Sequence, residues 1–171
     1  MLDRKFKTGD GKITTYAGMV ERIADYIRQA PDAEYEITVG ADSQNHSQTR
    51  MIEVIACRRI GRGGIFFYRS EMIKKITDLR QKIYEETSRS LENAHGLLDA
   101  ILEAILEKDV DFDLDRLNIH FVVHCDIGAT KESATRVLVK EITGWVEAEG
   151  FECVIKPDSY TACGIANKFS K

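Results

Sequence analysis

The stretch Glu36-Ile37-Thr38-Val39-Gly40-Ala41-Asp42-Ser43-Gln44-Asn45 decides how the chain is interpreted. In its first half apolar residues alternate with Thr and Gly, which predicts a strand over residues 36–41. Residues 42–45 are turn-forming polar residues, which predicts that the strand ends there. Asp42 is therefore expected directly after a strand, where ligands of open sheets collect.

The segments on either side of this strand continue a regular order of elements. Before it, apolar residues recur at helical spacing and predict a helix over about residues 15–30. After it, apolar runs and Gly-rich turns predict strands over residues 51–57 and 65–68, which complete an antiparallel meander. The remaining patterns predict helices over about 74–107 and 132–149, strands over 117–125 and 151–155, and a short helix over about 159–168. Gly96, inside the longest helix, indicates a bend or a close packing contact.

Without the first helix, the order of elements is βββαβαβα. A three-strand meander followed by two helix–strand crossovers predicts an α/β fold with a mixed five-stranded sheet, helices on both faces and an extra N-terminal helix. With 171 residues, of which 43% are hydrophobic, the chain is expected to form a single domain over residues 1–171. The N-terminal segment 1–31 is expected to pack on that domain.

The charge balance does not favour general binding of polyanions, because the formal net charge is -4 and the pI is about 5.6. One local exception lies between residues 58 and 82, where eight basic residues stand against two acidic ones. This stretch predicts a backbone-binding surface for nucleic acid, although charge runs are usually solvated faces. Its candidate contacts are Arg58, Arg62, Lys74, Lys75 and Arg80.

The cysteines and the N-terminus indicate a reduced, intracellular protein. The four cysteines are widely spaced, with no C-x-x-C pair. The chain starts with a polar stretch in place of an apolar signal segment, and no window approaches the roughly 20 apolar residues of a membrane span. We therefore expect a cytoplasmic protein that does not insert into a membrane.

Three acidic residues are the candidates for chemistry. Asp42 and Asp126 each follow directly on a predicted strand, and they would lie side by side if those strands are neighbours. Helical spacing places Glu86 near the buried face of the long helix, where a carboxylate costs free energy unless it is paired, hydrogen-bonded or bound to metal. Each residue also has an ordinary explanation: the two aspartates suit turns or caps, and Glu86 could face a basic side chain such as Arg136.

Convergence of the three carboxylates would require positive charge. No Lys or Arg is obvious between them in the sequence, so Mg²⁺ or Mn²⁺ is the expected remedy for their repulsion. Two such ions about 3.5 to 4 Å apart could activate a water and stabilise the leaving oxygen in phosphodiester hydrolysis.

At these residues the sequence resembles the YkuK-like family of the ribonuclease H-like superfamily, a group of bacterial proteins usually described as uncharacterised. The matching stretches spread from about residue 36 to the C-terminus, and as a set they are fairly specific. They are Val39-Gly40-Ala41-Asp42-Ser43-Gln44 with His46, Leu79-Arg80-Gln81-Lys82-Ile83-Tyr84-Glu85-Glu86 with Ser90, His124-Cys125-Asp126-Ile127-Gly128, and Lys156-Pro157-Asp158-Ser159-Tyr160.

The resemblance implies a ribonuclease H-like fold whose Asp-Glu-Asp core falls on Asp42, Glu86 and Asp126. Superfamily nucleases commonly add a fourth acid from the last helix, for which Asp158 and the non-acidic Asn167 are the candidates. Asp158 also suits the N-cap of that helix. On the residues themselves, His124 lies two positions before Asp126 on the same strand face, so it could flank the site or accept a proton.

Two classes of function follow from these residues. The first is a divalent-metal-dependent nuclease or related phosphodiester hydrolase, with Asp42, Glu86 and Asp126 as metal ligands, Asp158 and His124 as further catalytic candidates, and DNA, RNA or a hybrid as substrate. The alternative is a catalytically inactive ribonuclease H-like module that binds nucleic acid or protein. Nucleotide hydrolysis is disfavoured, because one domain offers no second lobe to close over a nucleotide.

Overall fold

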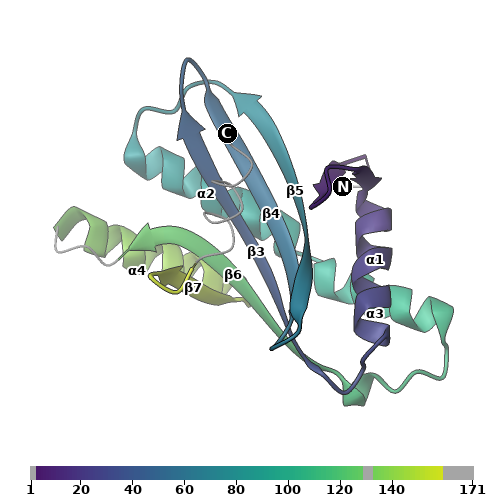
Figure 1. Ribbon diagram of the computed structural model, residues 1–171. Helices are drawn as coiled ribbons and strands as arrows, with labels where there is room; N and C mark the ends of the chain where they lie inside the picture. Colours follow the sequence, from purple (N-terminus) through teal and green to yellow (C-terminus); the bar gives the residue numbers. More distant parts are fainter. Residues whose placement is uncertain (1–2, 129–132, 160–171) are drawn as a thin grey trace.

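A single seven-stranded sheet organises the molecule, with strand order β2-β1-β5-β4-β3-β6-β7 (Figure 1). The structure is a computed structural model that describes residues 3–128 and 133–159. The strands are β1 (Lys5–Thr8), β2 (Ile13–Thr15), β3 (Glu34–Asn45), β4 (Thr49–Arg59), β5 (Gly63–Ile73), β6 (Asn118–Gly128) and β7 (Glu152–Lys156). Each of the five predicted strands is present, as β3 to β7.

The sheet is mixed, as predicted. β3 pairs antiparallel with β4 over the whole length from Tyr35–Arg59 to Asn45–Thr49, and β4 pairs antiparallel with β5. On its other edge β3 pairs parallel with β6, and β6 pairs parallel with β7. This arrangement places β3 between β4 of the meander and the crossover strand β6.

The prediction of five strands is wrong, because an N-terminal hairpin adds β1 and β2 to the sheet. β1 pairs antiparallel with β2 and, through Lys7 and Thr8, with β5. The two strands have four and three residues, and Phe6 is the one large apolar side chain that they bury. Strands this short and this polar lack the apolar alternation from which a strand is recognised.

The long helix predicted over residues 74–107 is two helices, α2 (Leu79–Ala94) and α3 (Leu97–Lys108). Gly96 separates them with a left-handed φ of 71°, and His95 has a non-helical ψ of 125°. Apolar residues keep a helical spacing on both sides of the break, so periodicity alone could not show it. Gly96 therefore marks a bend, which is one of the two roles that the sequence indicated.

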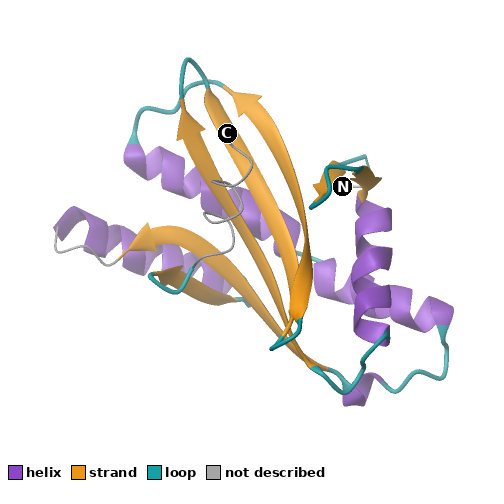
Figure 2. Ribbon diagram, viewed as in Figure 1, coloured by secondary structure: helices purple, strands orange, loops and turns teal. Residues whose placement is uncertain are grey.

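The helices lie on one face of the sheet in the described part of the chain (Figure 2). α1 (Tyr16–Arg28), α2, α3 and α4 (Ser133–Ala148) all contribute to the main apolar core, together with alternate residues of the strands such as Ile37, Val39 and Val123. A smaller cluster of Ile52, Val54 and Tyr68 lies on the opposite face.

Helices were predicted on both faces of the sheet, but the described residues place helices on one face only. The helix expected over about 159–168 lies outside them. Among the described helices, none is long and apolar enough to cross a membrane.

Candidate functional site

Asp42 lies within β3 and not after it, which corrects the predicted end of that strand. The four polar residues 42–45 stay in the strand because β4 continues to pair with them, up to Asn45 opposite Thr49. A partner strand that supplies backbone hydrogen bonds overrides the turn tendency of Asp, Ser and Asn. Asp42 is 8% exposed, so its carboxyl group is largely removed from water.

Asp126 lies in β6, the parallel neighbour of β3. The last printed pair of these strands is Gly40 opposite His124, and two residues further along each strand stand Asp42 and Asp126. Residues two apart share a sheet face, and the flanking Cys125 and Ile127 belong to the core under the helices. Asp42 and Asp126 therefore point to the opposite, helix-free face of the described sheet.

The pKa of Asp42 is raised, first because burial disfavours the carboxylate and second because the negative charge of Asp126 lies nearby. A hydrogen bond from the backbone N–H of Ser43 to Asp42 Oδ1, at 2.8 Å, partly offsets this rise. The neighbourhood of the two aspartates was an assumption in the sequence analysis, and the strand register supports it.

Glu86 approaches the same region from α2, on the other side of β3. Its side chain is buried, and Glu86 Oε1 accepts a hydrogen bond of 2.6 Å from the Ser43 hydroxyl. Burial raises the pKa of Glu86 to about 7, and the charges of Asp42 and Asp126 add to the rise. Ser43 thus links the helix acid, through its side chain, to the strand acid Asp42, through its backbone N–H.

Two lysines stand beside the acids, which corrects the expectation that no cation lies between them. Lys156 Nζ is 2.6 Å from Asp126 Oδ1, and Lys82 Nζ is 3.8 Å from Glu86 Oε1. Lys82 lies one helical turn before Glu86, whereas Arg136, the partner considered from the sequence, is exposed on α4. Lys156 comes from β7, so only the pairing of β6 with β7 brings it to Asp126.

The three carboxylates are suitable ligands for a hard divalent cation, but they are not arranged around one ion position. Carboxylate oxygens of Asp42, Asp126 and Glu86 are the ligands that Mg²⁺ and Mn²⁺ prefer. In residues 3–128 and 133–159, no three His, Cys, Asp or Glu side chains are placed so that they could hold one ion together. The two aspartates share a face, while Glu86 is turned toward Ser43.

His124 and Asp158, the further candidates, differ in their surroundings. His124 is 3% exposed, and its pKa is lowered mainly because burial disfavours the imidazolium. It is therefore neutral at pH 7, on the same sheet face as Asp126. Asp158 is exposed in a turn after β7, where its N–H donates to the carbonyl of Ile155 at 3.0 Å. The helix that it would cap and the alternative Asn167 lie outside the described residues.

Comparison with known proteins shows the family to which the chain belongs. A family model described as "Ribonuclease H-like" matches residues 18–171. The chain belongs to the ribonuclease H-like family. It is also 35% identical over 159 residues to "Uncharacterized protein YkuK" of Bacillus subtilis (strain 168), which covers 92% of this chain and 91% of the relative. The resemblance to the YkuK-like family is thereby confirmed. No solved structure matches the chain.

The basic stretch of this ribonuclease H-like chain does not form one surface. Arg58 and Arg62 lie at the end of the sheet where β4 turns into β5, and Lys74 and Lys75 follow the opposite end of β5. The two ends of β5 (Gly63–Ile73) are about 33 Å apart at 3.3 Å per residue.

Two of the basic residues already have acidic partners. Arg58 pairs with Glu36 at 3.1 Å. Arg80 pairs with Glu141 at 2.6 Å, between α2 and α4. Of the five candidates, Lys74 and Lys75 lie toward the end of β5 at which Asp42 is placed, since Asp42 pairs with Ile52 and Ile52 with Ser70.

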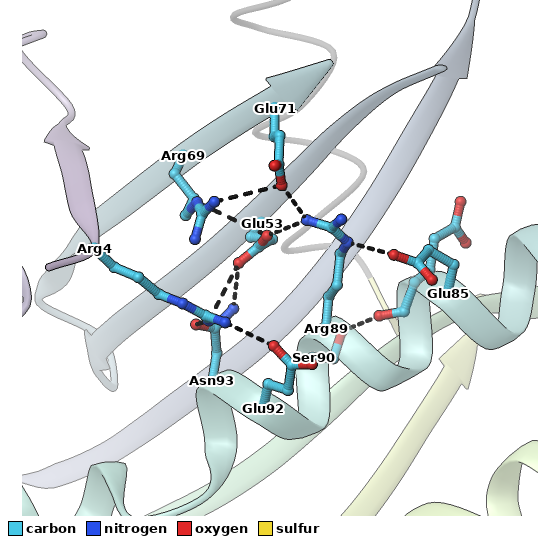
Figure 3. Close-up of polar contacts among 10 residues, drawn as sticks. Arg4, Glu53, Arg69, Glu71, Glu85, Arg89, Ser90, Glu92 and Asn93 are labelled. Atoms are coloured by element: carbon cyan, nitrogen blue, oxygen red, sulfur yellow. Dashed lines mark hydrogen bonds and ion pairs between the residues drawn. The ribbon is translucent and has the colours of Figure 1, made fainter. Parts of the chain in front are cut away.

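A second polar cluster, centred on Glu53, was missed by the sequence analysis (Figure 3). Glu53 is 2% exposed on β4 and faces α2, where Arg89 Nη1 contacts Glu53 Oε1 at 3.0 Å and Asn93 donates to Glu53 Oε2 at 2.7 Å. Arg4 and Arg69 stand 4.0 and 3.9 Å from the same carboxylate. A glutamate in the middle of an apolar strand was the signal that could have revealed it, because a buried charge requires partners.

The Glu53 cluster has a structural explanation. Its basic residues also contact acids outside Glu53: Arg89 contacts Glu71 and Glu85, and Arg4 contacts Glu92. The cluster therefore ties β4, β5, α2 and the N-terminal segment together, and each of its carboxylates lies within 4.0 Å of an arginine.

Proposed function

We propose that the protein is a divalent-metal-dependent phosphodiester hydrolase that acts on nucleic acid. The observation that carries the proposal is the placement of Asp42 and Asp126 side by side on neighbouring parallel strands, with the buried Glu86 joined to Asp42 through Ser43. Buried carboxyl groups with raised pKa values are costly for the fold, and such groups gather at functional sites.

Asp42, Asp126 and Glu86 are the residues that would hold Mg²⁺ or Mn²⁺. When bound, the metal supplies Lewis-acid activation of a water and charge stabilisation at phosphate. Without it, Lys156 and Lys82 compensate part of the negative charge at Asp126 and Glu86. Both lysines are flexible, partly exposed side chains, so they can leave the carboxylates when a divalent cation takes their place.

His124 can contribute a proton acceptor on the same face. Its imidazole is neutral at pH 7 because burial lowers its pKa. Two residue steps along β6 separate it from Asp126, a distance of about 7 Å along the strand. In this proposal His124 accepts a proton at a ring nitrogen, from water or a substrate hydroxyl.

The N-terminal hairpin supplies a basic surface on the face that carries Asp42. Lys5 and Lys7 are exposed and line an open cavity of about 690 Å³ together with Arg4, Arg69 and Ser70. Lys7 pairs with Tyr68 of β5. Ser70 lies two residues further along the same face of β5 and pairs with Ile52, which in turn pairs with Asp42. Three strand spacings of about 4.8 Å put the lysines roughly 15 Å from Asp42. Backbone phosphates of a bound strand are the ligands that two such lysines favour.

The experiment that tests this function is cleavage of labelled single-stranded, duplex and hybrid nucleic acids in Mn²⁺. We expect Asp126→Asn to abolish cleavage while the far-UV circular dichroism stays unchanged, because the amide keeps the shape of the side chain and removes its charge. Asp111→Asn, at an exposed loop position, is the matched control and should cleave as the wild type does. Equal cleavage by Asp126→Asn and wild type would overturn the assignment.

A non-catalytic module is the second candidate, and one observation favours it. The lysine partners of Asp126 and Glu86 lie where metal ions would otherwise compensate the charge. A module of this kind would bind nucleic acid equally well with Mn²⁺ and with EDTA, and it would cleave none of the three substrates.

A further inference from the structure

Two cysteines from neighbouring strands meet under the helices. Cys125 of β6 and Cys153 of β7 have their Sγ atoms 3.6 Å apart, and both are free thiols. Cys125 is 4% exposed, whereas Cys153 is half-buried and is therefore the more exposed of the two. The proposed hydrolase makes no use of either sulfur.

The backbone around Cys125 pairs less regularly with β7 than the residues before it do. The β6–β7 ladder is regular up to His124 opposite Val154, and the next pair is Gly128 opposite Lys156. Between these two pairs β6 advances by four residues and β7 by two. Cys125 lies in this irregular interval of β6. A disulfide needs the sulfurs at about 2.05 Å, so they must approach by roughly 1.5 Å, which side-chain rotation and this loosely paired segment can supply.

We propose that Cys125 and Cys153 form a reversible thiol-oxidation site whose co-substrate is a low-molecular-weight disulfide. The thiolate of the more accessible Cys153 attacks the external disulfide, forms a mixed disulfide and releases one thiolate. Cys125 Sγ then attacks Cys153 Sγ, its proton passes to the departing sulfur, and the second external thiol is released. The two protein thiols are oxidised to one disulfide, and the external disulfide is reduced to two thiols.

This bond would act on the strands that carry the acid–lysine pair. Asp126 follows Cys125 directly on β6, and Lys156 lies on β7 with Cys153. The disulfide would join β6 to β7 covalently where their ladder is interrupted, so the position of Asp126 relative to Lys156 would be fixed by a bond in addition to their 2.6 Å ion pair. The proposal does not depend on metal binding or hydrolysis.

The test uses the full chain with the other two cysteines replaced, Cys57→Ser and Cys163→Ser together. The folded, reduced protein is incubated with oxidised glutathione, quenched with acid, alkylated and analysed by intact mass and peptide mapping. We expect the mass to fall by two hydrogen atoms, no thiol to be alkylated, and the peptides of Cys125 and Cys153 to be cross-linked. Dithiothreitol should restore both thiols.

Single replacements give the matched controls. Adding Cys125→Ser should leave Cys153 as a stable mixed disulfide with glutathione, because no neighbouring thiol resolves it. Two free thiols, or a stable glutathione adduct on Cys153 while Cys125 is present, would overturn the proposal. Should the double variant fail to fold, the same mapping on the wild type decides the matter: Cys125 linked to Cys153 supports the proposal, and any other pairing or none contradicts it.

Discussion

The carboxyl group of Glu86 has a pKa raised to about 7 from 4.5, mainly because burial on α2 disfavours its charged form. A carboxyl group with a raised pKa stabilises the fold most at pH values below its unfolded pKa, and this stabilisation is lost as the pH rises to about 7. The ionised Glu86 therefore costs the folded state roughly 3 kcal/mol above that range, if the whole shift is realised.

This cost predicts a pH-dependent effect of Glu86→Gln. Glutamine keeps an acceptor for the Ser43 hydroxyl but carries no charge. In EDTA we expect the variant to exceed the wild type in free energy of unfolding by about 1–3 kcal/mol at pH 8, and the gain to shrink toward zero at pH 5. Urea denaturation at both pH values measures this gain in free energy of unfolding. Glu103→Gln, at an exposed position of α3, is the control. A gain that is the same at both pH values would contradict the assigned pKa.

At this scale the sequence predicted the burial of Glu86 but not the partners of the three acids. Helical spacing correctly placed Glu86 on the buried side of its helix. It could not reveal Lys156 beside Asp126, because that contact depends on the pairing of β7. Nor could it show that Ser43 joins Glu86 to Asp42, because strand and helix meet there only in the folded chain.

At the scale of elements, the break between α2 and α3 depends on the left-handed backbone of Gly96, with φ of 71°. Gly96→Ala places a Cβ in a conformation that L residues disfavour, although no atom lies within 4 Å of that Cβ. We expect the free energy of unfolding to fall by about 1 kcal/mol. The control is Gly144→Ala in α4, which also meets no atom within 4 Å and should raise it by about 1 kcal/mol.

Urea midpoints at unchanged m-values distinguish the two glycine variants. Similar changes in both would mean that Gly96 is not held in a strained conformation. Residues of the wrong type for a helix are therefore better evidence for a break than periodicity is. β3 is the opposite case, because there residue type predicted a turn at residues 42–45 and pairing with β4 maintained the strand.

At the scale of the whole molecule, the order of strands and helices predicted the mixed sheet, because apolar periodicity is strong in β3 to β7 and in the helices. The N-terminal hairpin was not predicted, although it adds Lys5 and Lys7 to the face that carries Asp42. The basic stretch read from the sequence is split between the two ends of β5, since residues close in sequence are carried apart by an extended strand.

This geometry predicts which basic residues contact nucleic acid. Changing both Lys5 and Lys7 to Gln should weaken binding of a single-stranded oligonucleotide and reduce the slope of log K against log salt by about 1.4, for two lost phosphate contacts. Changing Arg58 and Arg62 to Gln, at the far end of the sheet, should leave the slope nearly unchanged. Fluorescence anisotropy over a salt series in EDTA measures both. A larger loss in the arginine variant would place the bound strand at the other end of the sheet.

The central proposal is that Asp42, Asp126 and Glu86 are the residues that bind a divalent cation. The most direct measurement is a calorimetric Mn²⁺ titration of the wild type beside Asp42→Asn, with Asp111→Asn as the control, because it requires no assumption about substrate. We predict saturable binding to the wild type and to Asp111→Asn that is lost in Asp42→Asn. Binding of equal affinity in Asp42→Asn, or no binding by the wild type at millimolar Mn²⁺, would contradict the account.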